Sequence, residues 1–307
     1  MRKIIVNLKK QYLKECALSK KIIMFNKISQ NLPYKSVRAI KDKNVLIFLN
    51  KLMKNSNLKN ILEDETIEKK FVVKYAKWFQ SSKLNQIKNL KKFKFMTFAN
   101  GSSQVFDYFY AKNRTRRFRA YKGEYAYHFT SWRNHFPNWK YIKNLDIKKN
   151  DAVIISMPFS DTGSKHSEMD DLIKICNKLN VPVLIDCCYL TMCKGIEFDF
   201  NQKCVKEISF SLSKAFPVSR VRIGMRLSKI DDDDPLFFFQ KLGLVNRMGA
   251  YIGLKLIEKF EFDYIYKKYF KFQEFYCKKM SLEPSSVVCL ATGGKKWKSY
   301  NRGNKRN

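Results

Sequence analysis

The chain has 307 residues and a formal net charge of +34, and 45% of its residues are hydrophobic. This length allows one large domain and a smaller one, and the apolar content argues against a disordered chain. No apolar run approaches the ~20 residues of a membrane-spanning helix, and the N-terminus has no signal-peptide core, so we expect a cytoplasmic protein without a membrane segment. The lysines are spread through every segment, so the charge does not predict a nucleic-acid partner.

The eight cysteines and three histidines do not suggest a metal centre. They lack the paired Cys-x-x-Cys clusters of a zinc site, and thiols in a cytosolic protein stay reduced. We therefore expect neither a metal site nor disulfides.

The predicted elements divide the chain into three parts. Residues 1–79 are lysine-rich and should form an N-terminal arm and part of a small domain, with a helix over 68–79. Residues 80–243 predict a large ligand-binding α/β domain. Residues 244–307 predict a connecting helix, to about residue 260, and an incomplete small domain. In the large domain we expect strands near 94–99, 117–121, 151–157, 181–186, 205–210 and 222–228, and a helix at 167–179.

The first candidate site follows the strand at 95–99. Gly101, Ser102 and Ser103 form a turn there, and a helical stretch follows at 105–111. A strand, a glycine turn and a helix N-terminus present backbone N–H groups and the positive end of a helix dipole to a phosphate. A plain turn is the alternative, because most such triplets bind nothing.

Asp186 ends the second candidate segment, Val-Pro-Val-Leu-Ile-Asp, whose aliphatic residues are typical of a buried parallel strand. In open α/β sheets, ligands bind at this carboxyl edge, where we also expect the loop at 157–163. A carboxylate there can keep a ring nitrogen of a ligand protonated, and the hydroxyl of Tyr189 could donate to a ring oxygen. The alternatives are an N-cap for Asp186 and a core aromatic for Tyr189.

Lys214 follows the strand at 205–210 in the segment Ser-Phe-Ser-Leu-Ser-Lys, and Arg222 opens the next predicted strand. A lysine can form a Schiff base with an aldehyde, and serine hydroxyls with an arginine suit a phosphate. Pyridoxal phosphate needs both groups in one pocket. Either cation alone could be a solvated residue at a strand end, so the prediction depends on the combination with Asp186 and the glycine turn.

The motifs are Gly-Ser-Ser at 101–103, Pro-x-x-x-Thr-Gly at 158–163, Asp-x-x-Tyr at 186–189, and Ser-x-Ser-Lys at 211–214 with an arginine at 222. Their order resembles the fold-type I aminotransferases, and within them the class I/II branch that includes the aspartate and histidinol-phosphate enzymes. The resemblance covers about residues 95–228. It implies an α/β fold with a three-layer αβα large domain and a mostly parallel sheet. A smaller, truncated α+β domain would complete it.

The resemblance also implies residue roles. Lys214 would form the Schiff base, Asp186 would pair with the pyridine nitrogen, and Tyr189 would donate to the ring oxygen. Tyr125 stands where the family stacks an aromatic on the cofactor ring, with an ordinary core residue as the alternative. Ser160 replaces a family asparagine that contacts the ring oxygen, so this contact would be weaker or water-bridged. The phosphate site would consist of Gly101, Ser102, Ser103, Ser211, Ser213 and Arg222.

The implied activity is transfer of an amino group between an amino acid and a 2-oxo acid by a homodimer. A decarboxylase or lyase of the same fold, or a non-catalytic binding protein, stays open as an alternative. The family uses an arginine from the C-terminal domain to grip the substrate carboxylate, and no motif marks it here. Arg302 and Arg306 are the candidates. The chain after Lys214 is short for the family, so we expect its small domain to be incomplete.

Overall fold

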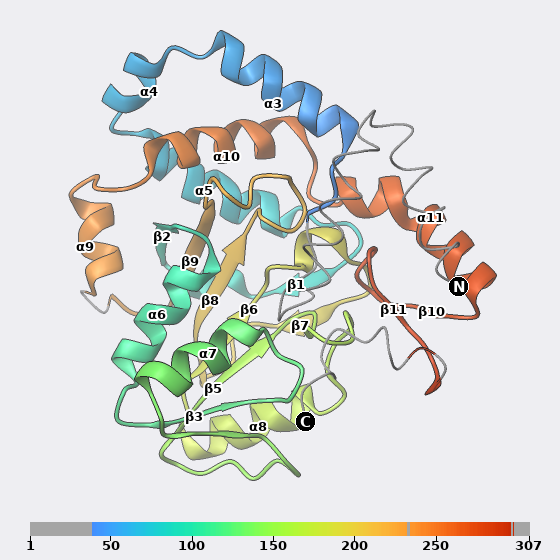
Figure 1. The fold of residues 1–307 in the computed structure, drawn as a ribbon. Coiled ribbons are helices and arrows are strands. Elements are labelled where there is room, and N and C mark those ends of the chain that lie inside the picture. The colour runs from blue at the N-terminus through green and yellow to red at the C-terminus, as the bar shows by residue number, and fades with distance from the viewer. Residues whose placement is uncertain (1–38, 232–233, 296, 298–307) are drawn as a thin grey trace.

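A computed structural model describes residues 39–231, 234–295 and 297. Its centre is a seven-stranded sheet of order β2-β9-β8-β6-β5-β3-β4 (Figure 1). The pairs from β8 to β4 are parallel, whereas β9 is antiparallel to both β8 and β2. The strands are β2 (Phe95–Ala99), β3 (Arg117–Ala120), β4 (Trp139–Tyr141), β5 (Asp151–Ser156), β6 (Val183–Asp186), β8 (Val205–Ser211) and β9 (Gly224–Ser228).

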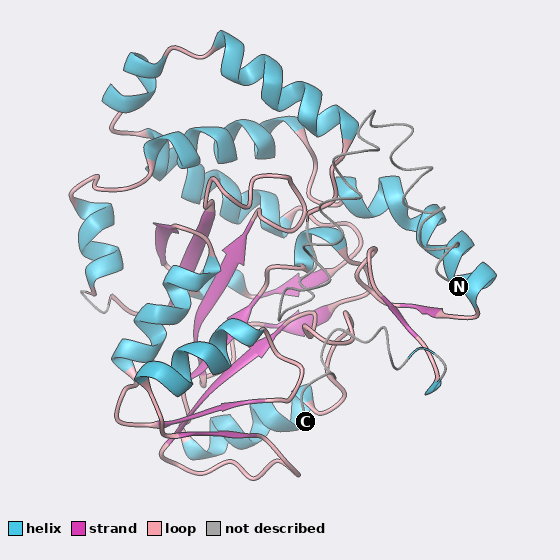
Figure 2. Ribbon diagram, viewed as in Figure 1, coloured by secondary structure: helices cyan, strands magenta, loops and turns pink. Residues whose placement is uncertain are grey.

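Helices cover both faces of this sheet (Figure 2). One face carries α5 (Ile67–Gln80), α8 (Met169–Leu179) and α10 (Arg247–Lys259), and the other carries α6 (Ser102–Lys112), α7 (Ala126–His135) and α9 (Pro235–Lys241). Along β5, Val153 and Ile155 pack into the first core, while Ala152 and Ile154 pack into the second. Burial on both faces gives a parallel strand a continuous apolar run. The predicted three-layer α/β fold with a mostly parallel sheet is confirmed.

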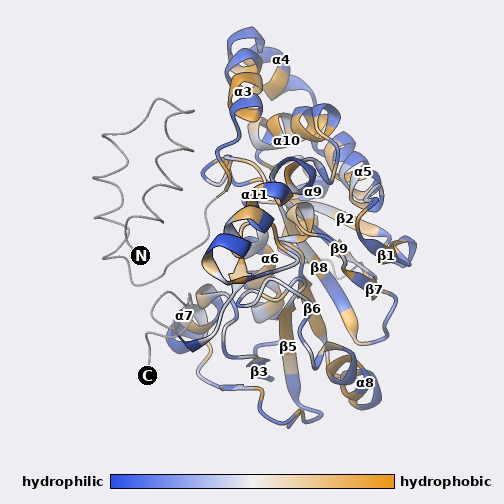
Figure 3. Cartoon of the chain, turned by 90° about the vertical axis from the view of Figure 1, so that its right-hand side faces the viewer, coloured by the Kyte–Doolittle hydropathy of each residue, from blue (hydrophilic) through white to orange (hydrophobic). Residues whose placement is uncertain are grey.

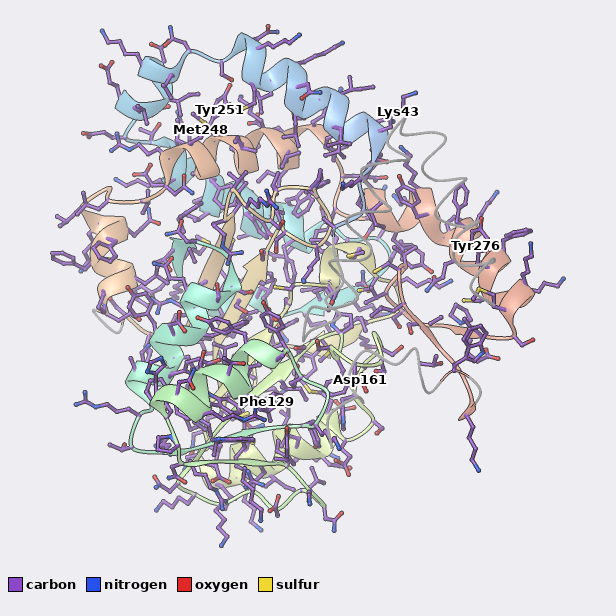
Figure 4. All side chains as sticks on the ribbon, viewed as in Figure 1. Lys43, Phe129, Asp161, Met248, Tyr251 and Tyr276 are labelled. Atoms are coloured by element: carbon purple, nitrogen blue, oxygen red, sulfur yellow. The ribbon has the colours of Figure 1, made fainter. Side chains whose placement is uncertain are left out.

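The remaining elements surround these layers. Near the N-terminus, α3 (Lys43–Asn55) and α4 (Leu58–Glu63) lie over α10, and Ser56 donates a hydrogen bond to the hydroxyl of Tyr251 on that helix (3.1 Å; Tyr251 is labelled in Figure 4). At the other end, α11 (Tyr264–Met280) contacts a short 3₁₀ helix, Leu190–Met192, and leads into the hairpin of β10 (Glu283–Pro284) and β11 (Ala291–Thr292). Figure 3 shows hydrophobic residues concentrated on the central strands. Among the described residues, no helix is both long and apolar enough to cross a bilayer.

At the amino edge of the sheet, the buried guanidinium of Arg119 ties three strands together. It donates to the carbonyl groups of Lys140 and Tyr141 on β4, and to Oδ2 of Asp151 at the start of β5 (2.7 Å). It also pairs with Asp146 in the loop before β5. Breaking a buried ion pair leaves an uncompensated charge, so such a network holds the strand ends firmly. The candidate site lies at the opposite, carboxyl edge.

Several predicted boundaries are shifted by one to three residues, and two of these lie at the candidate site. The strand expected from residue 222 begins at Gly224, because Arg222 has a φ of 62°, in the left-handed region. The helix expected over 105–111 begins at Ser102. The prediction also lacks α3, α4, α7, α9, α11, β4, the hairpin of β10 and β11, and the short parallel pair of β1 (Gln86–Lys88) and β7 (Glu197–Asp199). Of these, α9 carried a usable signal, because Asp234 caps it and Pro235 occupies its first turn.

Candidate active site

The carboxyl edge of the sheet brings the predicted motifs together. Ser156 ends β5, Asp186 ends β6 and Ser211 ends β8, and these parallel strands are neighbours. Strand β2 runs in the same direction, because it is antiparallel to β9, which is itself antiparallel to β8. The turn at Gly101 after β2 therefore reaches the same edge. This is the edge at which α/β sheets bind ligands.

Asp186 is buried at the end of β6, next to Ser209 on β8. Its Oδ1 accepts hydrogen bonds from Oγ of Ser209 (2.9 Å) and from the backbone N–H of Cys188 (3.3 Å). Burial raises the pKa of Asp186, while hydrogen bonds from Cys188 and Ser209 and the attraction of Lys214 oppose that rise. A buried carboxylate of this kind is best matched by a cation, which a protonated ring nitrogen can supply.

Lys214 lies in the turn after β8, near two tyrosine rings. Its Nζ is 5.8 Å from the ring centroid of Tyr125 and 5.8 Å from that of Tyr189. Tyr189 is buried, whereas Tyr125 is 40% exposed, which argues against the alternative that Tyr125 is an ordinary core residue. The three side chains come from separate loops, so the tertiary fold brings them together.

Hydroxyl, guanidinium and backbone groups gather at the N-terminus of α6. Nη2 of Arg222 donates to Oγ of Ser103 (2.7 Å) and to the carbonyl oxygen of Asn100 (3.0 Å). The hydroxyls of Ser211 and Ser213 share a hydrogen bond of 2.7 Å. The first N–H groups of a helix have no partner within it, so this cluster can bind an anion such as phosphate. We call these residues, with Gly101, the Arg222 cluster.

Gly101 is closely packed within this cluster. Its φ is 75°, and a Cβ atom placed on it would lie 2.4 Å from Nη2 of Arg222. A Cβ atom on Gly224, at the start of β9, would lie 2.8 Å from Cα of Gly101. Both glycines therefore permit a close approach that a side chain would block. The hydroxyl of Ser102 accepts a hydrogen bond from Sγ of Cys188 (3.1 Å), beside Asp186.

Ser160 is buried in the loop that follows β5. The C-terminal part of the chain holds this loop in place. Oγ of Ser285 donates to the carbonyl oxygen of Thr162 (2.6 Å), and the N–H of Val287 donates to that of Gly163 (2.9 Å). The segment after α11 thus contacts the loop that contains Ser160.

The sequence prediction missed three residues of this edge. Ser209 and Cys188 contact Asp186, and Glu124 lies directly before Tyr125. Ser209 had a usable signal, because residues two apart on a strand face the same side and Ser211 was already a candidate. Glu124 had none, because its partner lies on another strand. The two arginine candidates for the substrate carboxylate, at 302 and 306, lie outside the described residues.

Solved structures with different activities share this fold. The histidinol-phosphate aminotransferase of Clostridium acetobutylicum matches with a TM-score of 0.55 at 14% identity, over 80% of this chain and 75% of that chain. The L-threonine-O-3-phosphate decarboxylase of Porphyromonas gingivalis matches with a TM-score of 0.59 at 13% identity, over 83% and 79%. The PLP-bound C-S lyase of Staphylococcus hominis matches with a TM-score of 0.53 at 11% identity, over 84% and 74%. At these identities the likeness shows the fold alone.

Residues 92–257 match the family model of aminotransferase class I and II. Among curated proteins, none matches the sequence. The matched segment is more than half of the chain, and it contains every site residue from Gly101 to Arg222. The chain therefore belongs to the class I and II aminotransferase family.

Proposed function

We propose that this protein binds pyridoxal phosphate and transfers an amino group between an amino acid and a 2-oxo acid. The observation that carries the proposal is the convergence of Lys214, Asp186 and the Arg222 cluster at one edge of the sheet. Each fits one group of this cofactor: an amine fits the aldehyde, a buried carboxylate the ring nitrogen, and a guanidinium at a helix N-terminus the phosphate. Bound pyridoxal phosphate supplies an electron-withdrawing ring that stabilises negative charge at the substrate α-carbon.

Each site residue has one role in this proposal. Nζ of Lys214 binds the aldehyde and later moves the proton at the substrate α-carbon. Asp186 keeps a proton on the ring nitrogen, Tyr189 donates its hydroxyl to the ring oxygen, and Tyr125 packs on the ring face. Ser160 makes the weaker contact to the ring oxygen. The phosphate is bound by Gly101, Ser102, Ser103, Ser211, Ser213 and Arg222, with Ser102 acting through its backbone N–H.

A decarboxylase or lyase reaction is the second candidate, because it needs the same residues. The bond that breaks at the α-carbon depends on how the substrate is oriented against the ring. Enzymes with such reactions are among the solved structures of this fold. The group that grips the substrate carboxylate would decide the outcome, and Arg302 and Arg306 stay our candidates for it.

We also propose that the protein acts in the cytoplasm as a homodimer, joined through the large domain at 80–243. The charge of +34 on each subunit opposes association, but salt screens it over about 10 Å at 0.1 M. Light scattering at low and at moderate salt tests this, and a monomer at both would contradict it.

The proposed function is tested by light absorption and by product analysis. The purified protein, supplied with pyridoxal phosphate, is expected to turn yellow and to keep the colour through dialysis. A transaminase converts a matching amino acid to its 2-oxo acid and leaves the amino group on the cofactor, whereas a decarboxylase releases carbon dioxide. A protein that stays colourless and takes up no pyridoxal phosphate would contradict the proposal and favour a non-catalytic binding role.

A further inference from the structure

Glu124 is a buried acid that the proposed reaction does not use. It lies in the loop between β3 and α7, directly before Tyr125, and only 5% of its surface is exposed. Its Oε1 accepts the backbone N–H of Ser156 (2.7 Å), and its Oε2 accepts the Ser156 hydroxyl (2.5 Å). One carboxylate therefore binds both donors of a single residue on another strand.

Ser156 stands where the elements of the site meet. It is the last residue of β5 and pairs in register with Asp186 on β6. The next residue, Met157, donates its N–H to the carbonyl oxygen of Asp186 (2.8 Å) and begins the loop that contains Ser160. The contact between Glu124 and Ser156 thus links the loop that carries a ring-facing tyrosine to the strand end that carries the ring-nitrogen partner.

The loop before Tyr125 touches the same region at a second point. Gly123 has a φ of 103°, and a Cβ atom on it would lie 2.8 Å from Cβ of Asp161, which is labelled in Figure 4. Tyr125 itself is 40% exposed, and the rest of its ring lies against Tyr127 and His128 of α7. The position of this ring also depends on the backbone that precedes it, and the Glu124 side chain connects this backbone to Ser156.

The surroundings of Glu124 are typical of a functional site. Burial raises the pKa of Glu124 to about 7, hydrogen bonds from Ser156 and from the N–H of Tyr125 oppose the rise, and the charge of Asp186 adds to it. Asp186 has a raised pKa for the same main reason. Two buried acids side by side destabilise a fold, and such perturbed groups cluster where a protein binds or transforms a ligand.

We propose that Glu124 is a positioning residue of the cofactor site, which fixes the Tyr125 ring beside Lys214 by binding Ser156. The inference rests on the proposed function, because it concerns how the protein holds pyridoxal phosphate. In this proposal the length of the glutamate side chain and its two hydrogen bonds to Ser156 position the Tyr125 ring. The charge of Glu124 is not the property that matters.

Two conservative variants separate reach from charge. Glu124→Gln keeps the length of the side chain: its amide oxygen can accept the N–H of Ser156, and its amide group can donate to the Ser156 hydroxyl. Glu124→Asp keeps the charge but is one methylene shorter, so it loses contact with Ser156. Glu197, an exposed acid on β7, supplies the matched controls Glu197→Gln and Glu197→Asp.

Each variant is titrated with pyridoxal phosphate while the visible absorbance and the induced circular dichroism of the bound cofactor are recorded. Glu124→Asp is expected to bind pyridoxal phosphate about tenfold to a hundredfold more weakly, as for the loss of two ordinary hydrogen bonds, and to show a weaker dichroic band. The affinity of Glu124→Gln for pyridoxal phosphate is expected to stay within about threefold of that of the wild type. The Glu197 variants are expected to have the affinity of the wild type. Ser156→Ala removes one of the two hydrogen bonds and is expected to give an intermediate loss.

The outcomes separate this inference from the proposed function. Wild-type affinity and dichroism in Glu124→Asp would overturn the inference and leave the proposed function intact. A defect in Glu124→Gln with a normal Glu124→Asp would also overturn it, because charge would then be the property that matters. A wild-type protein that takes up no pyridoxal phosphate would overturn the proposed function itself.

Discussion

The Lys214→Ala variant is expected to lose all covalent capture of pyridoxal phosphate while still binding the free cofactor at the Arg222 cluster. Only an amine forms an imine with the aldehyde that borohydride reduces to a stable bond, and Lys214 is the lysine whose Nζ lies 5.8 Å from both tyrosine rings. Borohydride reduction followed by intact mass measurement checks this: the wild type should gain the mass of one cofactor, and the variant should gain none. Turnover should fall by several decades, each worth about 1.4 kcal/mol of barrier.

A control is needed because the chain carries 61 lysines and arginines, and free aldehydes also react with surface amines. Lys206→Ala is suitable, because Lys206 lies on β8, the strand that precedes Lys214, but near its amino end. The control should be labelled as the wild type is. Stoichiometric labelling of Lys214→Ala would show that another lysine is the attachment point.

Asp186→Ala is expected to retain the cofactor but to lose several decades of turnover. Without the carboxylate the ring nitrogen is no longer kept protonated, and an unprotonated ring withdraws electrons poorly from the substrate α-carbon. Each decade corresponds to about 1.4 kcal/mol of barrier, so a loss of four decades would amount to about 5.5 kcal/mol. Single-turnover kinetics with saturating cofactor measure the chemical step directly.

Asp186→Asn gives the matched test of structure against function. Burial raises the pKa of Asp186, so in the cofactor-free protein the ionised form of Asp186 destabilises the folded state. The neutral variant should therefore unfold in urea at the same or a higher concentration than the wild type, while turnover is lost. A variant that keeps most of its turnover would show that this carboxylate has only a structural role.

The strands of the sheet could be predicted because the reason for each one is local. In β5 and β6 every residue is buried, so their apolar runs indicate two covered faces without reference to the rest of the chain. The glycine turn and Asp186 were predictable for a similar reason, because the turn directly follows β2 and Asp186 is the last residue of β6. The family resemblance then assigned roles that spacing alone would not have given.

The remaining features depend on contacts between distant segments. Arg222 was placed in a strand because its neighbours are apolar, but its left-handed backbone is compatible with the close packing at Gly101. Helix α7 contains His128 and Trp132 in its buried face, and its apolar residues are spaced too irregularly to predict a helix from the sequence. Glu124 resembles any surface acid until β3 and β5 are seen to be neighbours.

The Arg119 network at the amino edge and Glu124 at the carboxyl edge give the two edges of the sheet opposite responses to acid. Burial would raise the pKa of Asp146, but hydrogen bonds from Lys143 and Arg119 hold this pKa at about 2, below the ordinary value of 3.8. The ionised Asp146 therefore stabilises the fold fully above pH 3.8, and this stabilisation is lost as the pH falls from 3.8 to about 2. The pKa of Glu124 is about 7 against an ordinary 4.5, so its contribution is complete below 4.5 and disappears as the pH rises through 7. Protonation therefore destabilises the amino edge of the sheet around Asp146 and stabilises the carboxyl edge around Glu124. Amide hydrogen exchange of the cofactor-free protein should show β3 opening first in acid and the end of β5 opening first in base; the same order at both extremes would contradict this.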